Sequence, residues 1–160
     1  MFENKYLEKL KKSPGWPSEE RLNKGPVAVI ECLEEIPCNP CETVCPKNSI
    51  TVGSPITNLP EFHDICTACG KCVMICPGLA IFLIDRTYSD KEALLTLPYE
   101  LLPLPVKGDK VVAIDRVGEA VCDGRVVRVN SNKSNNKTNL VSITVPKEYS
   151  DEVRFFKFDK

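Results

Sequence analysis

The sequence predicts an α+β fold in two parts: a cysteine-rich domain with an internal repeat and pseudo-two-fold symmetry over residues 27–84, and a small antiparallel β barrel or curled sheet over residues 108–160. Eight of the nine cysteines lie in the first part, where two short runs repeat at a fixed offset. The second part consists of β-branched, partly alternating runs separated by turn signals. Residues 1–26 then form an N-terminal helix and an irregular extension, and residues 85–107 form a proline-rich connector.

The N-terminal extension begins with a predicted helix. Residues 3–12 place three apolar side chains on one helical face, namely Tyr6, Leu7 and Leu10. Ser13-Pro14-Gly15 follows, and proline and glycine predict that the helix ends there. The stretch up to residue 26 is irregular. Residues 27–30 are apolar, which predicts a short strand that leads into the cysteine-rich domain.

An internal repeat dominates the cysteine-rich domain. Residues 38–46 read CNPCETVCP and residues 69–77 read CGKCVMICP, and the two runs align at an offset of 31 residues. The alignment extends to Ile50 and Ile81, each of which lies five residues after the last cysteine of its run. Each copy has the spacing C-x₂-C-x₃-C-P, which resembles the tail of a bacterial-type ferredoxin motif.

The second copy of the motif is complete, with the spacing Cys66-x₂-Cys69-x₂-Cys72-x₃-Cys76 followed by proline. Three thiolates at these spacings can converge on three corners of one iron–sulfur cube, while the fourth cysteine leaves on a helix toward a neighbouring cluster. Gly70 allows the backbone to come close to the inorganic sulfides. This copy therefore predicts a cluster site.

The first copy departs from the pattern. The repeat places its first ligand at position 35, which is Glu35, and the nearest upstream cysteine is Cys32. A longer loop between Cys32 and Cys38 can bring Cys32 to the same corner of the cube, and this is the preferred interpretation. Otherwise the site has three cysteine ligands and holds a three-iron cluster or a cube with a non-cysteine ligand. In that case Cys32 is a buried thiol.

The C-terminal part contains four predicted strands, in residues 110–117, 119–129, 139–145 and 153–158. Gly108-Asp109 and Asp123-Gly124 are turn signals, and the polar residues 130–139 predict a long solvated hairpin loop. Cys122 lies in a strand-like run and is interpreted as a core thiol. The prolines of the connector, Pro98, Pro103 and Pro105, argue against a long helix there.

Residues 32–83 resemble bacterial-type dicluster ferredoxins, which implies a ferredoxin-like domain with two [4Fe-4S] clusters. The ligand pairing in that family assigns one cluster to Cys32, Cys38, Cys41 and Cys76, and the other to Cys66, Cys69, Cys72 and Cys45. The crossed fourth ligand of each set would hold the two halves together and keep the clusters close enough for electron exchange. Apolar residues after each motif would form a dry shell, among them Ile50, Val52, Ile75, Leu79, Ile81 and Leu83.

A narrower resemblance lies in the flanking phrases GPVAVIECLEEIPCNPC, CPGLAIFLID and LPYELLPLPVKGD. They are similar to the iron–sulfur subunits that accompany FAD-dependent amino-acid and amine dehydrogenases of anaerobes, of the proline, hydroxyproline, sarcosine and opine type. The resemblance implies that the chain relays electrons from FAD-containing dehydrogenase subunits to an external ferredoxin or an NAD(P)-linked acceptor. Such a subunit belongs to a larger oxidoreductase and needs no catalytic site of its own.

Two other classes of function stay open. A freestanding ferredoxin with extensions is the first, but free carriers are short and strongly acidic, whereas this chain has a formal charge of −1 and nearly balanced flanks. A zinc-bound structural or nucleic-acid-binding module is the second. Zinc sites use two separate cysteine pairs rather than three cysteines within seven residues. No basic excess points to nucleic acid as a partner.

Several function classes lack their sequence signatures. The chain has no G-x-G-x-x-G motif and no P-loop, and its single histidine, His63, cannot build a Ser-His-Asp arrangement. No run approaches the ~18 apolar residues of a membrane span, and the charged first residues do not form a signal peptide. We therefore expect a cytoplasmic electron carrier without a membrane span.

Overall fold

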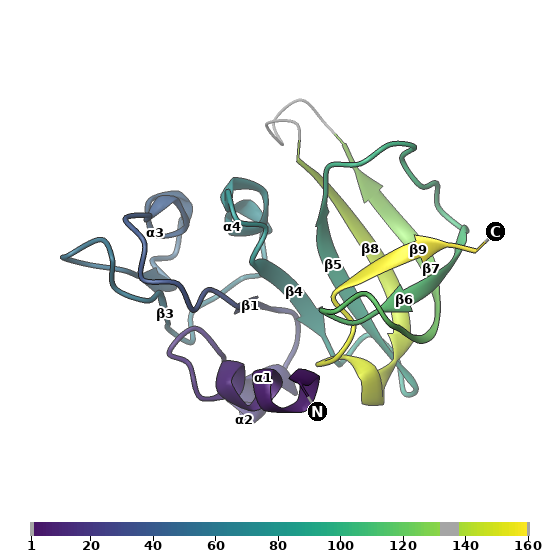
Figure 1. Cartoon of the computed structure of the whole chain (residues 1–160), viewed down its shortest axis with the longest axis horizontal. Coiled ribbons are helices and arrows are strands. Elements are labelled where there is room, and N and C mark those ends of the chain that lie inside the picture. Colours follow the sequence, from purple (N-terminus) through teal and green to yellow (C-terminus); the bar gives the residue numbers. More distant parts are fainter. Residues whose placement is uncertain (1, 132–137, 160) are drawn as a thin grey trace.

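A computed structural model of the chain describes residues 2–131 and 138–159 (Figure 1). Its helices and strands are, in chain order, α1 (Phe2–Lys11), α2 (Glu19–Leu22), β1 (Val27–Ile30), α3 (Pro40–Val44), β2 (Ile50–Thr51), β3 (Glu61–Phe62), α4 (Lys71–Ile75), β4 (Ile81–Asp85), β5 (Glu92–Tyr99), β6 (Lys110–Ile114), β7 (Ala120–Asn130), β8 (Asn139–Pro146), the 3-10 turn η2 (Lys147–Tyr149) and β9 (Phe155–Phe158).

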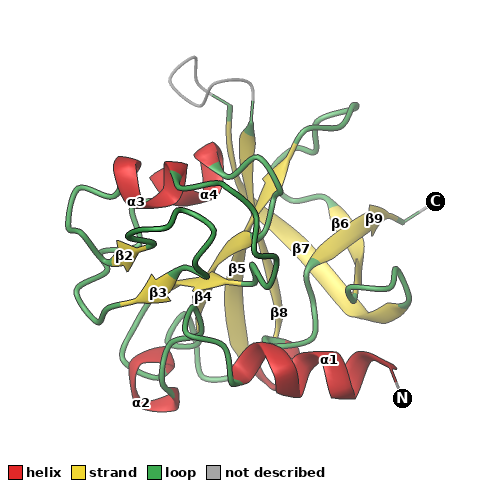
Figure 2. Ribbon diagram, turned by 60° about the vertical axis from the view of Figure 1, so that its left-hand side comes forward, coloured by secondary structure: helices red, strands yellow, loops and turns green. Residues whose placement is uncertain are grey.

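Seven strands form one antiparallel sheet in the order β1-β4-β5-β8-β7-β6-β9, and β2 and β3 pair separately. Helices α3 and α4 lie on one side of β1 and β4, and α1 and α2 lie on the other (Figures 1 and 2). The predicted α+β class is confirmed. The sheet is open, because no pairing joins its edge strands β1 and β9 among the described residues. Of the two expected forms, a barrel or a curled sheet, the described residues form the open sheet and no closed barrel.

The N-terminal helix is found where the sequence predicts it. Tyr6, Leu7 and Leu10 all pack on the main apolar core, and Leu10 is fully buried. The chain then passes close to β1, because a Cβ atom on Gly15 would lie 2.9 Å from the Cβ atom of Ile30. Only glycine fits this approach without a shift of the strand.

The two cysteine runs adopt matching backbone structures. Helices α3 and α4 begin and end at equivalent positions of the repeat. Asn48 and Leu79, also equivalent, both adopt left-handed backbone conformations, with φ of 55° and 52°. The pairing of β1 with β4 and of β2 with β3 completes the correspondence. The repeat in the sequence is therefore a repeat of the backbone as well.

The cysteine-rich part and the C-terminal part share one sheet. Residues 92–99, within the expected connector, form strand β5, which pairs with β4 on one side and with β8 on the other. Pro98 argued against a helix here, but it is tolerated in this strand, because the β4 pairing ends at Thr96 and Pro98 has a strand partner on the β8 side alone. The structure thus differs from an irregular connector, and the domain boundaries at residues 84 and 107 stay predictions.

The C-terminal strands follow the prediction except at one turn. Asp123-Gly124 lies inside β7, and the chain turns instead at residues 115–118, where the Gly118 N–H donates to the Asp115 carbonyl. A Cβ atom on Gly124 would lie 3.1 Å from the carbonyl oxygen of Thr144, so this glycine permits close strand packing. Most of the predicted loop over residues 130–139 lies outside the described residues.

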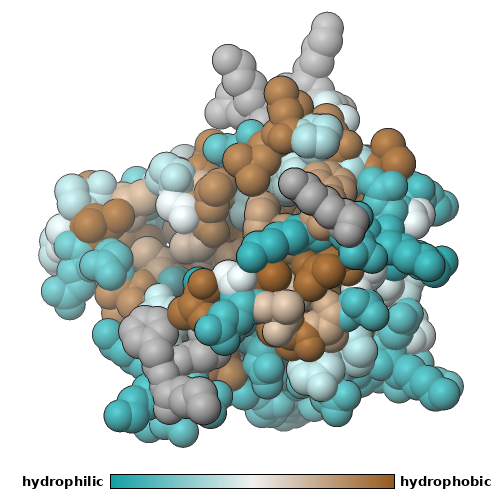
Figure 3. All heavy atoms as spheres, turned by 45° about the vertical axis from the view of Figure 1, so that its right-hand side comes forward, coloured by the Kyte–Doolittle hydropathy of each residue, from teal (hydrophilic) through white to brown (hydrophobic). Residues whose placement is uncertain are grey.

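Buried apolar side chains form two clusters. The larger lies against the sheet and includes Leu95, Val141 and Phe156. The smaller surrounds the cysteines, and it contains four members of the expected dry shell, namely Ile50, Val52, Ile81 and Leu83. Hydrophobic and polar patches alternate on the surface (Figure 3). Among the described side chains, the most exposed large apolar one is Leu102, at 87%, in the segment between β5 and β6.

Candidate functional site

The eight clustered cysteines divide into two groups of four around two cavities. Cys32, Cys38, Cys41 and Cys76 line the first cavity. Cys45, Cys66, Cys69 and Cys72 line the second. These are the two sets that the ferredoxin resemblance implies, with the last cysteine of each run contributing to the other run's cavity. Cys32 lies with the first set, as the longer-loop interpretation requires.

Helices α3 and α4 produce this crossed arrangement. Each has one cysteine inside it, Cys41 or Cys72, and a second at its C-terminal end, Cys45 or Cys76. The residue before a proline is held out of the helical conformation, and both terminal cysteines precede prolines and have extended ψ angles of 113° and 114°. Each short helix therefore presents one thiol to each cavity.

Backbone N–H groups point at three of the cysteine sulfurs. The Ser49 N–H donates to Cys45 Sγ at 3.3 Å, and the equivalent Ala80 N–H donates to Cys76 Sγ at 3.4 Å. A third donation, from the N–H of Ala68 to Cys66 Sγ, spans 3.3 Å, and Ala68 has a φ of 53°. Such donors stabilise thiolate and sulfide charge.

Burial and crowding disfavour free thiolates in the second cavity. Burial raises the pKa of Cys72 to about 12, and the nearby thiols of Cys66, Cys69 and Cys45 contribute to the rise. Burial by itself would also raise the pKa of Cys45, but backbone N–H groups outweigh it and lower that pKa. Four thiolates gathered in this way would need positive charge between them, which a bound metal centre would supply.

In the first cavity, burial and neighbouring thiols also raise cysteine pKa values. Burial raises the pKa of Cys41 to about 11, and the neighbouring Cys76 and Cys38 thiols add to this effect. The pKa of Cys32 is also raised, by burial first and then by Cys76 and Cys38. Cys32 is therefore an electrostatic neighbour of the Cys38 and Cys76 thiols.

Two other residues of interest lie apart from these cavities. Cys122 lies in β7, packs against the main core and has a pKa raised by burial to about 11. His63 pairs through Nε2 with the Thr51 hydroxyl at 2.8 Å, between β2 and the segment after β3. Neither residue lines either cysteine cavity.

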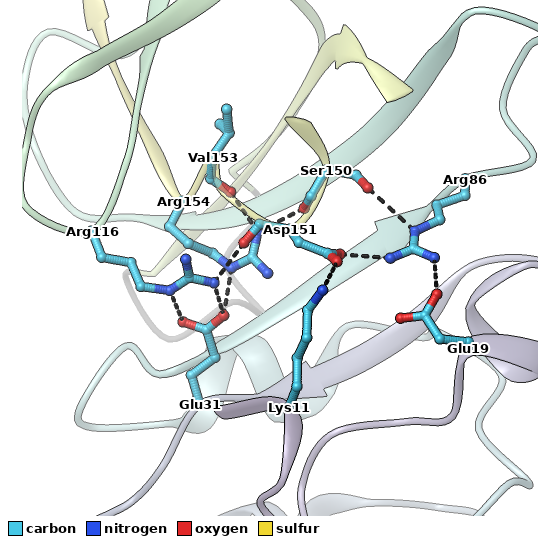
Figure 4. Close-up of polar contacts among 9 residues, drawn as sticks. All are labelled: Lys11, Glu19, Glu31, Arg86, Arg116, Ser150, Asp151, Val153 and Arg154. Atoms are coloured by element: carbon cyan, nitrogen blue, oxygen red, sulfur yellow. Dashed lines mark hydrogen bonds and ion pairs between the residues drawn. The ribbon is translucent and has the colours of Figure 1, made fainter. Parts of the chain in front are cut away.

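A buried charge network next to Cys32 was not anticipated from the sequence (Figure 4). Glu31 accepts hydrogen bonds from Arg116 Nε at 2.9 Å and from Arg154 Nε at 2.6 Å. Burial opposes ionisation of Glu31, but the two guanidinium groups outweigh it and lower its pKa. Arg116 and Arg154 lie 85 and 123 residues from Glu31, so no local sequence signal could have paired them.

The network extends to the N-terminal helices. Asp151 binds Lys11 Nζ at 2.8 Å and Arg86 Nη2 at 2.7 Å. Arg86 also binds Glu19, at 2.7 Å. These contacts fix the cysteine-bearing segment, α1 and α2 against the C-terminal strands (Figure 4).

Comparison with known proteins identifies the family that the second copy of the motif resembles. Residues 62–82, which include Cys66, Cys69, Cys72 and Cys76, match the family model of the 4Fe-4S binding domain. This chain contains a 4Fe-4S ferredoxin-type domain. The complete cysteine motif of residues 66–77 is therefore an iron–sulfur motif of the ferredoxin type, as the sequence predicts. The cysteine donor set of the 4Fe-4S domain fits that cofactor, and the matched residues cover one motif of the two.

The relatives of the 4Fe-4S domain are only partial matches. The chain is 44% identical over 48 residues to one subunit of an ion-translocating oxidoreductase complex of Methanosarcina acetivorans, and the match covers 30% of this chain and 17% of that protein. It is 39% identical over 49 residues to an uncharacterised ferredoxin of Methanocaldococcus jannaschii, covering 31% and 28%. The chain thus spans less than a third of either relative. No solved structure matches it.

The described α-helices are at most ten residues long. None of those over residues 2–131 and 138–159 is long and apolar enough to cross a bilayer.

Proposed function

We propose that this chain holds two [4Fe-4S] clusters and relays electrons from FAD-containing dehydrogenase subunits to an external acceptor. The observation that carries the proposal is the division of eight cysteines into two crossed groups of four around separate cavities. Cys32, Cys38, Cys41 and Cys76 would hold one cluster, and Cys45, Cys66, Cys69 and Cys72 the other. Each cluster, when bound, takes up and releases one electron.

The position of Cys32 supports a four-cysteine first site over a three-iron site. Strand β1 brings the chain to the cavity, because Ile30 pairs with Ile81 and the Glu31 N–H donates to the Ala80 carbonyl at 2.8 Å. Residues 33–37 then form the loop between Cys32 and Cys38, which is three residues longer than the loop between Cys66 and Cys69. Cys32 lines the cavity rather than packing elsewhere as an isolated thiol.

The short helices α3 and α4 each connect the two cysteine groups, which supports rapid electron exchange between the two clusters. Cys41 and Cys45 lie four residues apart on α3, which corresponds to about 6 Å along a helix axis, and they line different cavities. Cys72 and Cys76 repeat this relation on α4. An electron would therefore cross between clusters over the length of one helical turn of protein.

Exposed side chains on the surface and one of the similar proteins support the proposal that this chain works with a fixed protein partner. Cys69 is the exposed member of the second cysteine group, which gives electrons a short exit to a neighbouring protein. Leu101, Leu102 and Val106 are exposed apolar side chains in one of the phrases that resemble dehydrogenase subunits. One relative is itself a subunit of an oxidoreductase complex. The acceptor would be an external ferredoxin or an NAD(P)-linked flavin, in the cytoplasm.

Anaerobic purification from the native host, with iron, sulfide and flavin counts on the co-eluting proteins, tests this proposal. We expect about eight irons per chain, four for each cluster, together with a flavin-bearing partner. About seven irons would exclude Cys32 as a ligand. A brown chain that elutes alone would favour the freestanding ferredoxin. Zinc in place of iron would overturn the proposal.

A further inference from the structure

The two copies of the motif differ at one buried position beside the crossed cysteine. Ser49 and Ala80 are equivalent in the repeat, and each donates its backbone N–H to the sulfur of the preceding cysteine. Ser49 is 1% exposed, and its hydroxyl has no hydrogen-bond partner among the described residues. Ala80 offers no hydroxyl to the first cavity. The two sites therefore present different numbers of hydrogen-bond donors.

The surroundings of the Ser49 hydroxyl determine what it can bind. Ser49 lines the second cavity together with Cys45, Cys66, Cys69 and Cys72. Its backbone N–H donates to Cys45 Sγ at 3.3 Å, which places the residue beside that sulfur, while its hydroxyl forms no hydrogen bond in this geometry. A buried hydroxyl without an acceptor is unfavourable, and the acceptors that a loaded cavity supplies are sulfur atoms.

We propose that the Ser49 hydroxyl donates a hydrogen bond to sulfur at the second cluster, either Cys45 Sγ or an adjacent inorganic sulfide, and makes this cluster the easier of the two to reduce. The inference rests on the proposed two-cluster function. A hydrogen bond to sulfur stabilises the additional negative charge of the reduced cluster and raises its potential. Ser49 thus acts through the cluster sulfur, and the added electron would reside on the second cluster, whose ligand Cys69 is exposed.

Redox titration of the full-length, cluster-loaded protein, followed by electron paramagnetic resonance, tests the inference. We expect Ser49→Ala to lower the midpoint potential of one cluster and to leave the other unchanged. The mirror variant Ala80→Ser places a hydroxyl at the equivalent position of the first site and should raise the potential of the other cluster. Electron–nuclear double resonance should lose one exchangeable proton coupling in Ser49→Ala.

Defined outcomes overturn the inference. Unchanged potentials in Ser49→Ala with full iron content would do so, and so would equal shifts of both clusters, because a general loosening of the fold affects both sites. If Ser49→Ala fails to retain its cluster, Ala80→Ser decides: a raised potential supports the inference, and an unchanged one overturns it. The wild-type iron count separately tests the two-cluster proposal, since a single-cluster protein fails there before any variant is compared.

Discussion

Glu31 and Arg154 form a buried ion pair with 2.6 Å between Oε1 and Nε (Figure 4). Their side chains are only 7% and 4% exposed. The Arg154 guanidinium also lies over the rings of Trp16 and Phe82, at 6.0 and 5.4 Å from their centroids. Glu31 immediately precedes Cys32, so this pair fixes the entry to the first cysteine cavity against the segment before β9.

Glu31→Gln should destabilise the protein strongly. The change leaves two buried guanidinium groups without their shared carboxylate, and breaking a buried pair in this way costs about 3–5 kcal/mol. Anaerobic urea unfolding followed by circular dichroism measures the effect. The control is Glu20→Gln, which removes an exposed ion pair with Lys24 and should cost less than about 0.5 kcal/mol. Equal costs for the two variants would contradict the prediction.

Asp151 should make stability depend on pH in the acid range. Burial by itself raises its pKa, but Lys11 and Arg86 outweigh burial and lower that pKa below the ordinary 3.8. A lowered folded-state pKa means that the stabilisation is present above about pH 4 and is lost as the pH falls further. The difference in unfolding free energy between wild type and Asp151→Asn should therefore shrink below pH 4.

Unfolding of both proteins between pH 7 and pH 3 checks this expectation. Acid loss of clusters affects wild type and variant alike, so the difference isolates the carboxylate. Asp90→Asn, which alters an exposed turn residue, serves as the matched control. A wild-type advantage over Asp151→Asn that persists unchanged at pH 3 would refute the assignment.

Cys32→Ala should remove one iron from the first cluster. With Cys38, Cys41 and Cys76 still in place, we expect the count to fall from about eight to about seven irons per chain, with a three-iron signal in the oxidised protein. Iron analysis and electron paramagnetic resonance measure both. Cys122→Ala alters a cysteine outside the cavities and should leave the count unchanged. A full count in Cys32→Ala would show that another group completes the site.

Gly70→Ala should weaken the second site. Gly70 precedes α4 with a φ of 82°, and an added Cβ atom would lie 2.9 Å from Leu140 Cδ1. We expect a loss of about 1–2 kcal/mol from the left-handed conformation, with a further loss where Leu140 must move. Gly118→Ala is the control, because its φ is 89° but its added Cβ meets nothing within 4 Å. A Gly70 variant no less stable than the Gly118 variant would contradict the steric argument.

The sequence alone determined the local chemistry of the 4Fe-4S domain. Three cysteines within seven residues, followed by a fourth before a proline, are the spacing of an iron–sulfur ligand set, and the proline ends the helix at a defined residue. The repeat was visible because corresponding helices and turns use the same short spacings. Strand existence in the C-terminal part was likewise predictable from β-branched residues.

Pairings between distant segments were not predictable in this way. The proline-rich stretch gave no sign that residues 92–99 would join β4 to β8, because Pro98 argues against regular structure while tertiary pairing on both sides imposes it. Asp123-Gly124 is a turn signal in isolation, yet a residue without a side chain is also what close packing against β8 requires.

Cys32 illustrates the difference between what is determined by the sequence and what is decided by the tertiary structure. Its spacing in the sequence left open whether it completes the first site, since a five-residue loop can lead toward the cavity or away from it. Tertiary structure decided its placement, through the pairing of β1 with β4 and the anchoring of Glu31 by Arg116 and Arg154. Short-range spacing specifies which atoms can share a centre, whereas burial and charge pairing across the whole chain specify where a flexible loop comes to rest.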